Sequence, residues 1–168
     1  MSTRNRRPIP AVAFTRRNLP LLLLQGRDAV LARFRPILQA HGLTEQQWRI
    51  VRALLDSGPL EPRQIGRLCC ISSPSLAGVL ARMDELGLVQ RERLTQDARR
   101  VLVSLSPASR ALAASMAPQI EASYAELERQ LGADFLARLV RMLDTLGSRL
   151  DAAAADDDNR GRAGLRSR

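Results

Sequence analysis

The sequence contains no lysine, because all 26 of its basic residues are arginines, and against 17 acidic residues they give a net charge of +9. Arginine favours planar, bidentate partners such as phosphate and guanine. Aromatic residues make up 3% of the chain, and His41 is the only histidine. A single histidine limits acid–base chemistry, and the sequence shows no Ser/His/Asp set, glycine-rich phosphate loop or paired-carboxylate site. The sequence therefore does not indicate an enzyme.

Cysteine is nearly absent too, with Cys69 and Cys70 adjacent in the chain. Neighbouring cysteines form only a strained ring when bridged, so we do not expect a structural disulfide. Successive helical positions point in different directions, which favours at least one buried thiol, and a redox switch is the alternative. No Cys/His cluster has the spacing of metal ligands. We expect neither a metal nor a cofactor.

Long apolar runs are missing as well, since none approaches the ~20 residues of a membrane span. Residues 15–19 partly resemble a twin-arginine export signal, but only Leu21 to Leu24 follow before polar residues resume. That run is too short for an export signal. We expect a cytoplasmic protein without a membrane partner, and its 168 residues suffice for one domain or two small ones sharing a core.

The most informative segment is Leu60 to Leu105, which predicts a short helix, a turn and a second helix opening at Ser72-Ser73-Pro74-Ser75. Ser73 can cap the second helix, Pro74 suits its first turn, and Gly87 can end it in the left-handed conformation. Apolar residues at three- and four-residue spacing predict one buried face, made of Leu76, Val79, Leu80, Met83 and Leu86.

The opposite face of this second helix carries small residues, including Ala81, which can approach the floor of a DNA groove closely. Serine hydroxyls and backbone N–H groups at the helix start can meet phosphates or base edges. The alternative is a small-residue face packed against another helix. We predict DNA contacts from Ser72, Ser73, Pro74, Ser75, Ala77, Gly78 and Arg82.

Two β-prone segments follow, residues 88–94 and 100–105, with residues 95–99 as the tip of a hairpin. Asp97 precedes Arg99 by two residues, where a carboxylate could orient the guanidinium for a minor groove. A helix-turn-helix followed by a basic hairpin is an arrangement that recognises DNA; a merely solvated hairpin is the alternative. Arg91 adds to the positive edge, and the predicted DNA contacts of the hairpin are Arg93, Gln96, Asp97, Arg99 and Arg100.

Helices flank this unit on both sides. Thr44-Glu45-Gln46-Gln47 begins one with a capping box, and residues 19–40 are helical in pattern with a kink expected at Pro36. Ser106-Pro107 begins a long helix, bent at Pro118, and Gly132 separates it from the last one. Apolar seams run along these helices: Trp48, Val51, Leu54 and Leu55; Val30, Leu31, Phe34 and Leu38; Leu112, Met116, Ile120, Tyr124, Leu127 and Leu131; and Leu139, Leu143, Leu146 and Leu150.

The outer seams exceed what one winged unit can cover, so they imply a partner. A homodimer is economical, because two-fold symmetry also places two DNA-reading helices about one DNA turn apart on a palindrome. The predicted fold is mainly α with a small β-wing, a winged helix-turn-helix flanked by N- and C-terminal dimerisation helices. Its parts are a disordered basic arm at 1–18, the helical dimerisation region at 19–42 and 106–152, the winged helix-turn-helix at 43–105 and a disordered tail at 153–168.

This order of elements resembles the MarR family of bacterial transcriptional regulators. Asp97-Ala98-Arg99-Arg100 and Leu86-Gly87-Leu88-Val89 match the most specific local pattern of the family, over a resemblance from about Leu19 to Leu150. The runs FRPIL at 34–38 and LTEQQWRIVR at 43–52 are similar to the regulators of homoprotocatechuate degradation, and the nicotinate-degradation regulators are near relatives. Pro74 in the first turn of the DNA-reading helix departs from the pattern, so individual base contacts do not transfer.

The resemblance implies a repressor that leaves a palindromic operator when a small aromatic acid binds between the dimer region and the winged unit, in an aromatic or nicotinate catabolic operon. A carboxylate needs a cation and an aromatic ring needs an apolar wall. Arg27 and Trp48 are the first candidates, although Trp48 also suits a core position. The full predicted effector set is Arg27, His41, Trp48, Arg49, Arg52 and Arg91.

Two other functions fit the same residues. Cys69 or Cys70 could make the protein a thiol-based redox-sensing repressor, released by oxidant and by no aromatic acid. Alternatively, the protein could be a helical interaction module whose basic wing binds an acidic protein instead of DNA. Strong preference for one palindromic duplex over random duplex would exclude that second alternative.

Overall fold

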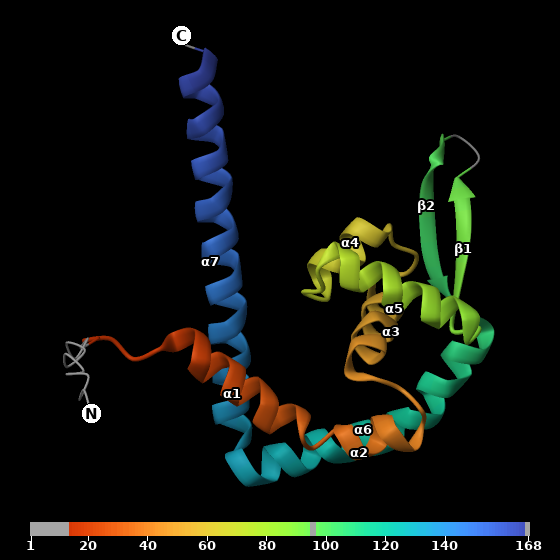
Figure 1. Cartoon of the computed structure of the whole chain (residues 1–168). Coiled ribbons are helices and arrows are strands. Elements are labelled where there is room, and N and C mark those ends of the chain that lie inside the picture. Colours follow the sequence, from red (N-terminus) through yellow and green to blue (C-terminus); the bar gives the residue numbers. More distant parts are fainter. Residues whose placement is uncertain (1–13, 95–96, 167–168) are drawn as a thin grey trace, which may run out of the picture.

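The computed structural model describes residues 14–94 and 97–166, and the side chains of residues 94, 97–99 and 153–166 lie outside that description. Within it the chain forms seven helices and one antiparallel hairpin (Figure 1). The elements are α1 (Leu19–Leu31), α2 (Arg35–Ala40), α3 (Glu45–Ser57), α4 (Pro62–Leu68), α5 (Ser73–Glu85), β1 (Val89–Leu94), β2 (Asp97–Leu105), α6 (Pro107–Leu131) and α7 (Ala133–Arg166).

Local sequence signals set most of the helix boundaries. The capping box predicted at α3 is confirmed, since Thr44 Oγ1 accepts from the Gln47 backbone N–H (3.2 Å) and Gln47 Oε1 accepts from the Thr44 N–H (2.8 Å). Asn18 and Ser106 cap α1 and α6 through their side chains. Gly87 follows α5 with φ +65°, the left-handed conformation expected of it.

The predicted helix over residues 19–40 is two helices in the structure. α1 ends at Leu31, and α2 begins at Arg35 with Pro36 in its first turn. Proline has no backbone N–H to donate to the preceding turn, so a new helix starts where that donor is not needed. The break lets α1 leave α2 at an angle, as Figure 1 shows.

The predicted disordered tail is also different, because α7 continues through Arg166. Four consecutive alanines, residues 152–155, span the predicted boundary between the helical region and the tail, at residue 152. Alanine has the highest helix propensity and no other local signal stops the helix there. Of the predicted N-terminal arm, residues 1–13 lie outside the described residues.

Two clusters of buried side chains organise the packing. The first joins α3, α4, α5 and the base of the hairpin, and the second joins α2 to α6. Trp48 of α3 is partly buried and packs against both clusters. Fully buried members of the first cluster are Ile50, Val51, Leu54, Ile65, Met83 and Val103, and buried members of the second are Phe34, Leu38, Leu43, Met116, Ile120 and Leu127.

The seam predicted along α6 is therefore largely covered by α2 of the same chain. Two of its members differ from the expectation, since Tyr124 is 53% and Leu131 is 45% exposed. α6 passes through Pro118 without ending, and Figure 1 shows it changing direction along its length. A proline inside a helix removes one backbone hydrogen bond, which accounts for such a bend.

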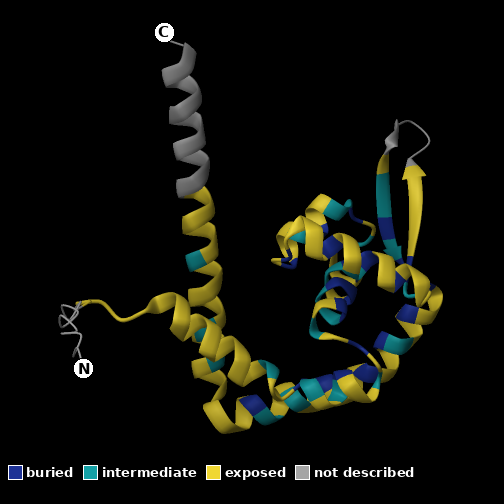
Figure 2. Ribbon diagram, viewed as in Figure 1, coloured by how far each residue is buried: buried dark blue, intermediate teal, exposed yellow. Residues whose placement is uncertain are grey.

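Most residues of α1 and of the coloured part of α7 are exposed (Figure 2), and many of them are apolar. α1 has no buried residue, and α7 makes few contacts with the remainder of the described chain. No described helix combines the length and the apolar character that crossing a membrane requires. Exposed apolar residues of the two helices include Leu19, Leu21, Leu23, Leu24, Phe135, Val140, Met142, Leu143 and Leu150.

Candidate nucleic-acid interface and effector pocket

The helix-turn-helix is formed by α4, a short turn and α5. The turn closes through a hydrogen bond from the Ile71 N–H to the Gly66 carbonyl oxygen (3.0 Å) and contains Cys70 with φ +49°. A Cβ added to Gly66 would lie 3.2 Å from the carbonyl oxygen of Ile71. Glycine at 66 therefore allows the turn to approach α4 closely.

α5 begins one residue earlier than its predicted cap allows, because Ser72, not Ser73, is the N-cap residue. The Ser72 hydroxyl donates to Ser75 Oγ (3.1 Å) and makes no cap bond to the backbone. The buried face is confirmed for Leu76, Leu80 and Met83. Leu86 was expected to be buried but is 46% exposed, because it follows the last residue of α5 and lies off its inner face.

The face of α5 predicted to read DNA points away from the core. All seven of its predicted contact residues are exposed: Ser72, Ser73, Pro74, Ser75, Ala77, Gly78 and Arg82. Arg82 pairs with Glu85 one turn later (3.0 Å), and both side chains are mostly exposed. A Cβ added at Gly78 would meet no atom within 4 Å. The structure therefore leaves this face uncovered in the described chain.

The hairpin is longer than the sequence predicts, because β2 starts at Asp97 rather than Arg100. The strands pair in antiparallel register from Val89 with Leu105 to Arg93 with Val101, and an irregularity follows before Leu94 pairs with Asp97. Residues 97–99 thus belong to a strand in which the register shifts. Gln96 and the side chains of Asp97 and Arg99 lie outside the described residues, so their DNA contacts stay predictions.

Three arginines of the hairpin have described side chains. Arg91 lies 3.4 Å from a carboxylate oxygen of Asp84 at the end of α5. Arg100 Nε donates to Glu61 Oε1 (2.6 Å), at the residue that precedes α4. Arg93 is exposed and makes no ion pair within the described residues. Of these three described guanidinium groups, two are held by carboxylates of the helix-turn-helix, and that of Arg93 pairs with no described carboxylate.

The predicted effector residues fall into separate places. Trp48 and Arg52 of α3 share a hollow of about 230 Å³ with Arg110 of α6, floored by the alanines and Ile120 of that helix. Trp48, Arg49 and Arg52 also share a second hollow of about 370 Å³, which α3 forms with Leu68 and Cys69 at the end of α4. Trp48 and Arg52 are therefore the pair that the structure brings together best.

Arg49 is attached to the helix-turn-helix itself. Its Nη1 donates to the carbonyl oxygen of Cys69 (2.6 Å), the residue that ends α4. Its Nε is buried and has no hydrogen-bond partner among the described atoms. Arg49 connects α3, which lines both hollows, with the turn that sets the position of α5.

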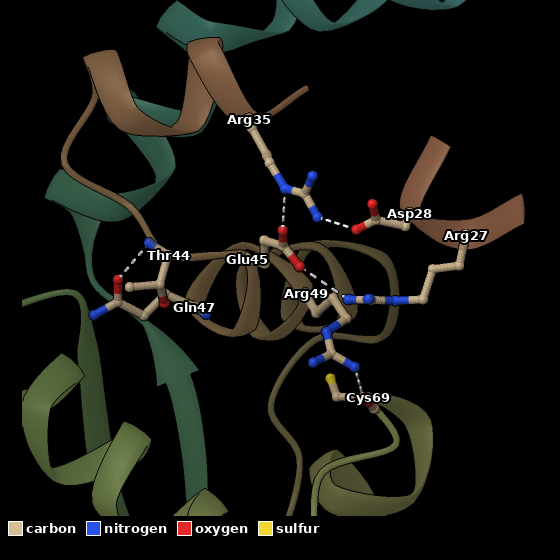
Figure 3. A network of polar contacts seen from close by, with 8 residues as sticks. All are labelled: Arg27, Asp28, Arg35, Thr44, Glu45, Gln47, Arg49 and Cys69. Carbon is tan, nitrogen blue, oxygen red and sulfur yellow. Dashed lines mark hydrogen bonds and ion pairs between the residues drawn. The ribbon is translucent and has the colours of Figure 1, made fainter. Parts of the chain in front are cut away.

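Arg27, the first sequence candidate, belongs to a network of charges between α1, α2 and α3 (Figure 3). Its guanidinium pairs with Glu45 Oε2 (2.9 Å), and Arg35 Nε donates to Glu45 Oε1 (2.7 Å). Arg35 also pairs with Asp28. Hydrogen bonds from Arg35 lower the pKa of both carboxyl groups below their ordinary values. An effector carboxylate at Arg27 would therefore compete with Glu45 for the guanidinium.

The last two candidates are elsewhere. Nδ1 of His41 lies 2.9 Å from the carbonyl oxygen of Ile37 at the end of α2. Arg91 lines a groove of about 860 Å³ between α4 and α5, away from Trp48. The sequence analysis missed three arginines at these surfaces: Arg63 and Arg67, which line the groove one helical turn apart on α4, and Arg110 beside Trp48. The first two could have been found from their i, i+4 spacing; Arg110 has no local signal.

The two cysteines differ in environment. Cys69 is buried, and burial raises the pKa of its thiol, which disfavours the reactive thiolate. Cys70 is exposed. Among the described residues no three His, Cys, Asp or Glu side chains form a group that could hold a metal ion.

Glu45→Gln is expected to lower the free energy of unfolding at pH 7 by no more than about 1 kcal/mol, because both of its ion pairs are partly exposed. The folded protein lowers the pKa of Glu45, so its contribution is present above the ordinary carboxyl pKa and is lost as the pH falls through the lowered one. Urea unfolding from pH 7 to pH 2 should show the wild-type and variant curves converging in acid. The matched control is Glu128→Gln, an exposed change on α6; a difference for Glu45→Gln that is independent of pH would refute the ionic explanation.

A helix-turn-helix with an uncovered second helix, followed by an arginine-bearing hairpin, defines the winged helix class of DNA-binding proteins. The sequence model of the MarR family matches residues 41–100. The chain is 40% identical over 127 residues to the homoprotocatechuate degradative operon repressor of Escherichia coli. The matched residues make up 76% of this chain and 86% of that repressor. The chain belongs to the MarR family of transcriptional regulators.

Solved structures agree with the sequence relatives. The transcriptional regulator PA4135 is 41% identical with a TM-score of 0.77, over 79% of this chain and 98% of that one. NadR, crystallised in complex with 4-hydroxyphenylacetate, is 32% identical with a TM-score of 0.72, over 81% and 96% of the two chains. The predicted fold class and family are confirmed. The chain is a MarR-type DNA-binding transcriptional repressor and not an enzyme.

Proposed function

We propose that the chain acts as a homodimer on a palindromic operator and that a small aromatic carboxylic acid releases it. The main support for a ligand of this kind is the hollow between α3 and α6, which is lined by the aromatic ring of Trp48 and by Arg52 and Arg110. An aromatic ring and a carboxylate need these two surfaces side by side. The relatives supply the chemical class, since NadR was crystallised with 4-hydroxyphenylacetate and the E. coli relative is named for homoprotocatechuate.

The exposed apolar surface of α1 and α7 supports the homodimer. Leu19 and Leu23 of α1 line a hollow of about 550 Å³ with Leu139, Met142 and Leu143 of α7. A second copy related by two-fold symmetry would cover this surface and present two α5 helices to one face of DNA. Three arginines at its edge would flank such a contact: Arg138, Arg141 and Arg149.

The position of Trp48 supports coupling between ligand and DNA. Trp48 packs against both buried clusters, so a ligand beside it contacts the junction of the winged unit with the α2–α6 pair. Its neighbour Arg49 holds the end of α4 through the Cys69 carbonyl. A ligand that prefers a different angle between these parts would change the separation of the two α5 helices and weaken operator binding.

The proposal is tested by a gel-shift assay on DNA from the region upstream of the gene, with 4-hydroxyphenylacetate, homoprotocatechuate and 6-hydroxynicotinate added separately. We expect a specific complex that at least one acid dissociates. Release by peroxide and by none of the acids would support redox sensing instead. Equal competition by random duplex would favour the interaction module.

Arg52→Gln is expected to leave operator affinity unchanged and to raise the dissociation constant of the releasing acid by about 10- to 100-fold, the range for losing a hydrogen bond to a charged group. The neutral amide of the same acid should bind wild type weakly, and Arg52→Gln should prefer the acid over the amide less strongly than wild type does, with Arg110 still lining the hollow. Isothermal titration calorimetry measures both ligands.

The matched control is Arg27→Gln, which removes the same charge from an arginine held by Glu45 at 2.9 Å, a closer ion pair than the 3.8 Å contact of Arg52 with Asp56. We expect its preference for acid over amide to equal that of wild type. If Arg27→Gln loses this preference and Arg52→Gln keeps it, the carboxylate binds at the α1–α3 network instead of between α3 and α6.

A further inference from the structure

The segment before α4 pairs with β2 at one residue, as a very short third strand beside the hairpin. Leu60 exchanges both backbone hydrogen bonds with Val103 of β2, from the Leu60 N–H to the Val103 oxygen (3.0 Å) and from the Val103 N–H to the Leu60 oxygen (2.8 Å). In the antiparallel register of this bridge, Glu61 stands opposite Leu102. Arg100, two residues from Leu102 along β2, is therefore the diagonal neighbour of Glu61 on one face of the sheet.

The diagonal pair is bonded in the structure. Arg100 Nε donates to Glu61 Oε1 at 2.6 Å, and its Nη2 contacts the same oxygen. Glu61 is also fixed at its backbone, because its N–H donates to Gln64 Oε1 (2.8 Å) in the first turn of α4. The carboxylate that holds Arg100 thus belongs to a residue anchored to the helix-turn-helix.

This ion pair lies farther toward the hairpin tip than the other contacts between wing and helices. The Leu60–Val103 bridge and the Arg91–Asp84 pair both join the base, since Arg91 is itself paired with Val103. Beyond Arg100 the strands have lost their regular register. The direction in which the tip leaves the helix-turn-helix therefore depends on the Glu61–Arg100 contact more than on any other described side-chain pair of the wing.

We propose that Glu61 is a positioning residue for operator binding, which holds Arg100 so that the wing has the direction required by the groove. Arg100 in this arrangement supports the wing, and Arg93, exposed and without an ion pair to a described residue, is available to a phosphate. The inference rests on the operator binding described under the proposed function. Because the ion pair orders the wing before binding, less conformational entropy is lost when the complex with DNA forms.

A direct contact of Arg100 with DNA would predict the opposite effect of Glu61→Gln on operator affinity. If Arg100 left Glu61 to bind a phosphate, Glu61 would compete with DNA, and removing its charge would tighten the complex. Glu92 provides a matched control for the charge change, because it is exposed on β1 and pairs with Leu102 from the other side. Each of the two variants, Glu61→Gln and Glu92→Gln, removes one negative charge, and the two positions lie on opposite sides of Leu102 in the sheet.

The test is operator binding by full-length protein, measured by fluorescence anisotropy across a salt titration. We expect Glu61→Gln to weaken operator binding about three- to tenfold with an unchanged salt slope, and Glu92→Gln to leave it equal or tighter. Arg100→Gln should weaken it similarly, and the double variant should be no weaker than the worse single one. The exchanged pair, Glu61→Arg with Arg100→Glu, should recover most of the wild-type affinity.

Tighter or unchanged binding by Glu61→Gln overturns the inference, as does additive loss in the double variant. An exchanged pair that binds no better than Arg100→Gln, with a reduced salt slope, would show that Arg100 contacts phosphate. Circular dichroism of each variant separates loss of fold from loss of wing position, and the exchanged pair keeps the test decisive if a single variant unfolds. Wild type that binds no operator would overturn the proposed function as well.

Discussion

A protein carrying Met142→Asp is expected to be a monomer and to bind its operator about 100-fold more weakly than wild type, because two linked DNA-reading units gain roughly 10² to 10⁴ over one. Met142 is 65% exposed on α7 and lines the apolar hollow between α7 and α1. A carboxylate there would have to be desolvated in a two-fold interface, and arginines at the edge of the hollow would offset only part of that cost. Light scattering gives the mass, and anisotropy gives the operator affinity.

Ser148→Asp is the matched control, because it adds the same charge to α7 at a residue outside that hollow. We expect it to dimerise as wild type does. A Met142→Asp protein that stays dimeric at micromolar concentration would show that this hollow is not the dimer contact, and the partner surface would have to be sought elsewhere on α1 or α7.

The second large effect is expected at Gly78, in the middle of α5. Glycine inside a helix costs roughly 0.5 to 1 kcal/mol relative to alanine, and nothing in the described chain lies within 4 Å of the place a Cβ would take. The fold therefore does not need glycine at this position, whereas a DNA groove approached closely would. Gly78→Asp should keep the fold and lose at least about 100-fold in operator affinity, since like charges brought together cost several kcal/mol.

Gly78→Ala separates the steric effect of a side chain at this position on operator binding from the effect of its charge. It should raise the free energy of unfolding by about 0.5 to 1 kcal/mol and weaken operator binding less than Gly78→Asp does. Thermal melts and anisotropy on the same preparations measure both. Wild-type operator affinity in Gly78→Asp would remove α5 from the DNA interface.

Local signals predicted the winged unit well. The capping box at Thr44, the left-handed Gly87 and the periodicity of Leu76, Leu80 and Met83 each act within one or two helical turns, so one segment of sequence contains the whole cause. The early start of β2 was missed because pairing with β1, not the propensity of residues 97–99, brings them into the strand. α7 extends beyond its predicted end because the alanine run at 152–155 favours continuation of the helix into the polar tail.

The candidate sites were less predictable, because their contacts join residues distant in sequence. The sequence offers Arg27 as a cation for an effector carboxylate, yet Glu45, 18 residues later in the chain, pairs with it. Arg100 meets Glu61 across 39 residues, and Arg110 shares a hollow with Trp48 because α6 packs against α3. Periodicity identifies which face of a helix is buried, but it does not tell which charges on two exposed faces will meet.

The most direct test of the central claim is the dissociation constant of the releasing aromatic acid, measured by calorimetry for the free dimer and again for the dimer bound to operator duplex. Linkage requires that DNA weaken acid binding by the same factor by which the acid weakens DNA binding, and about 5- to 150-fold is typical of such coupling. We expect two equal factors in that range. Acid that binds with the same affinity in both states would contradict a ligand-released repressor.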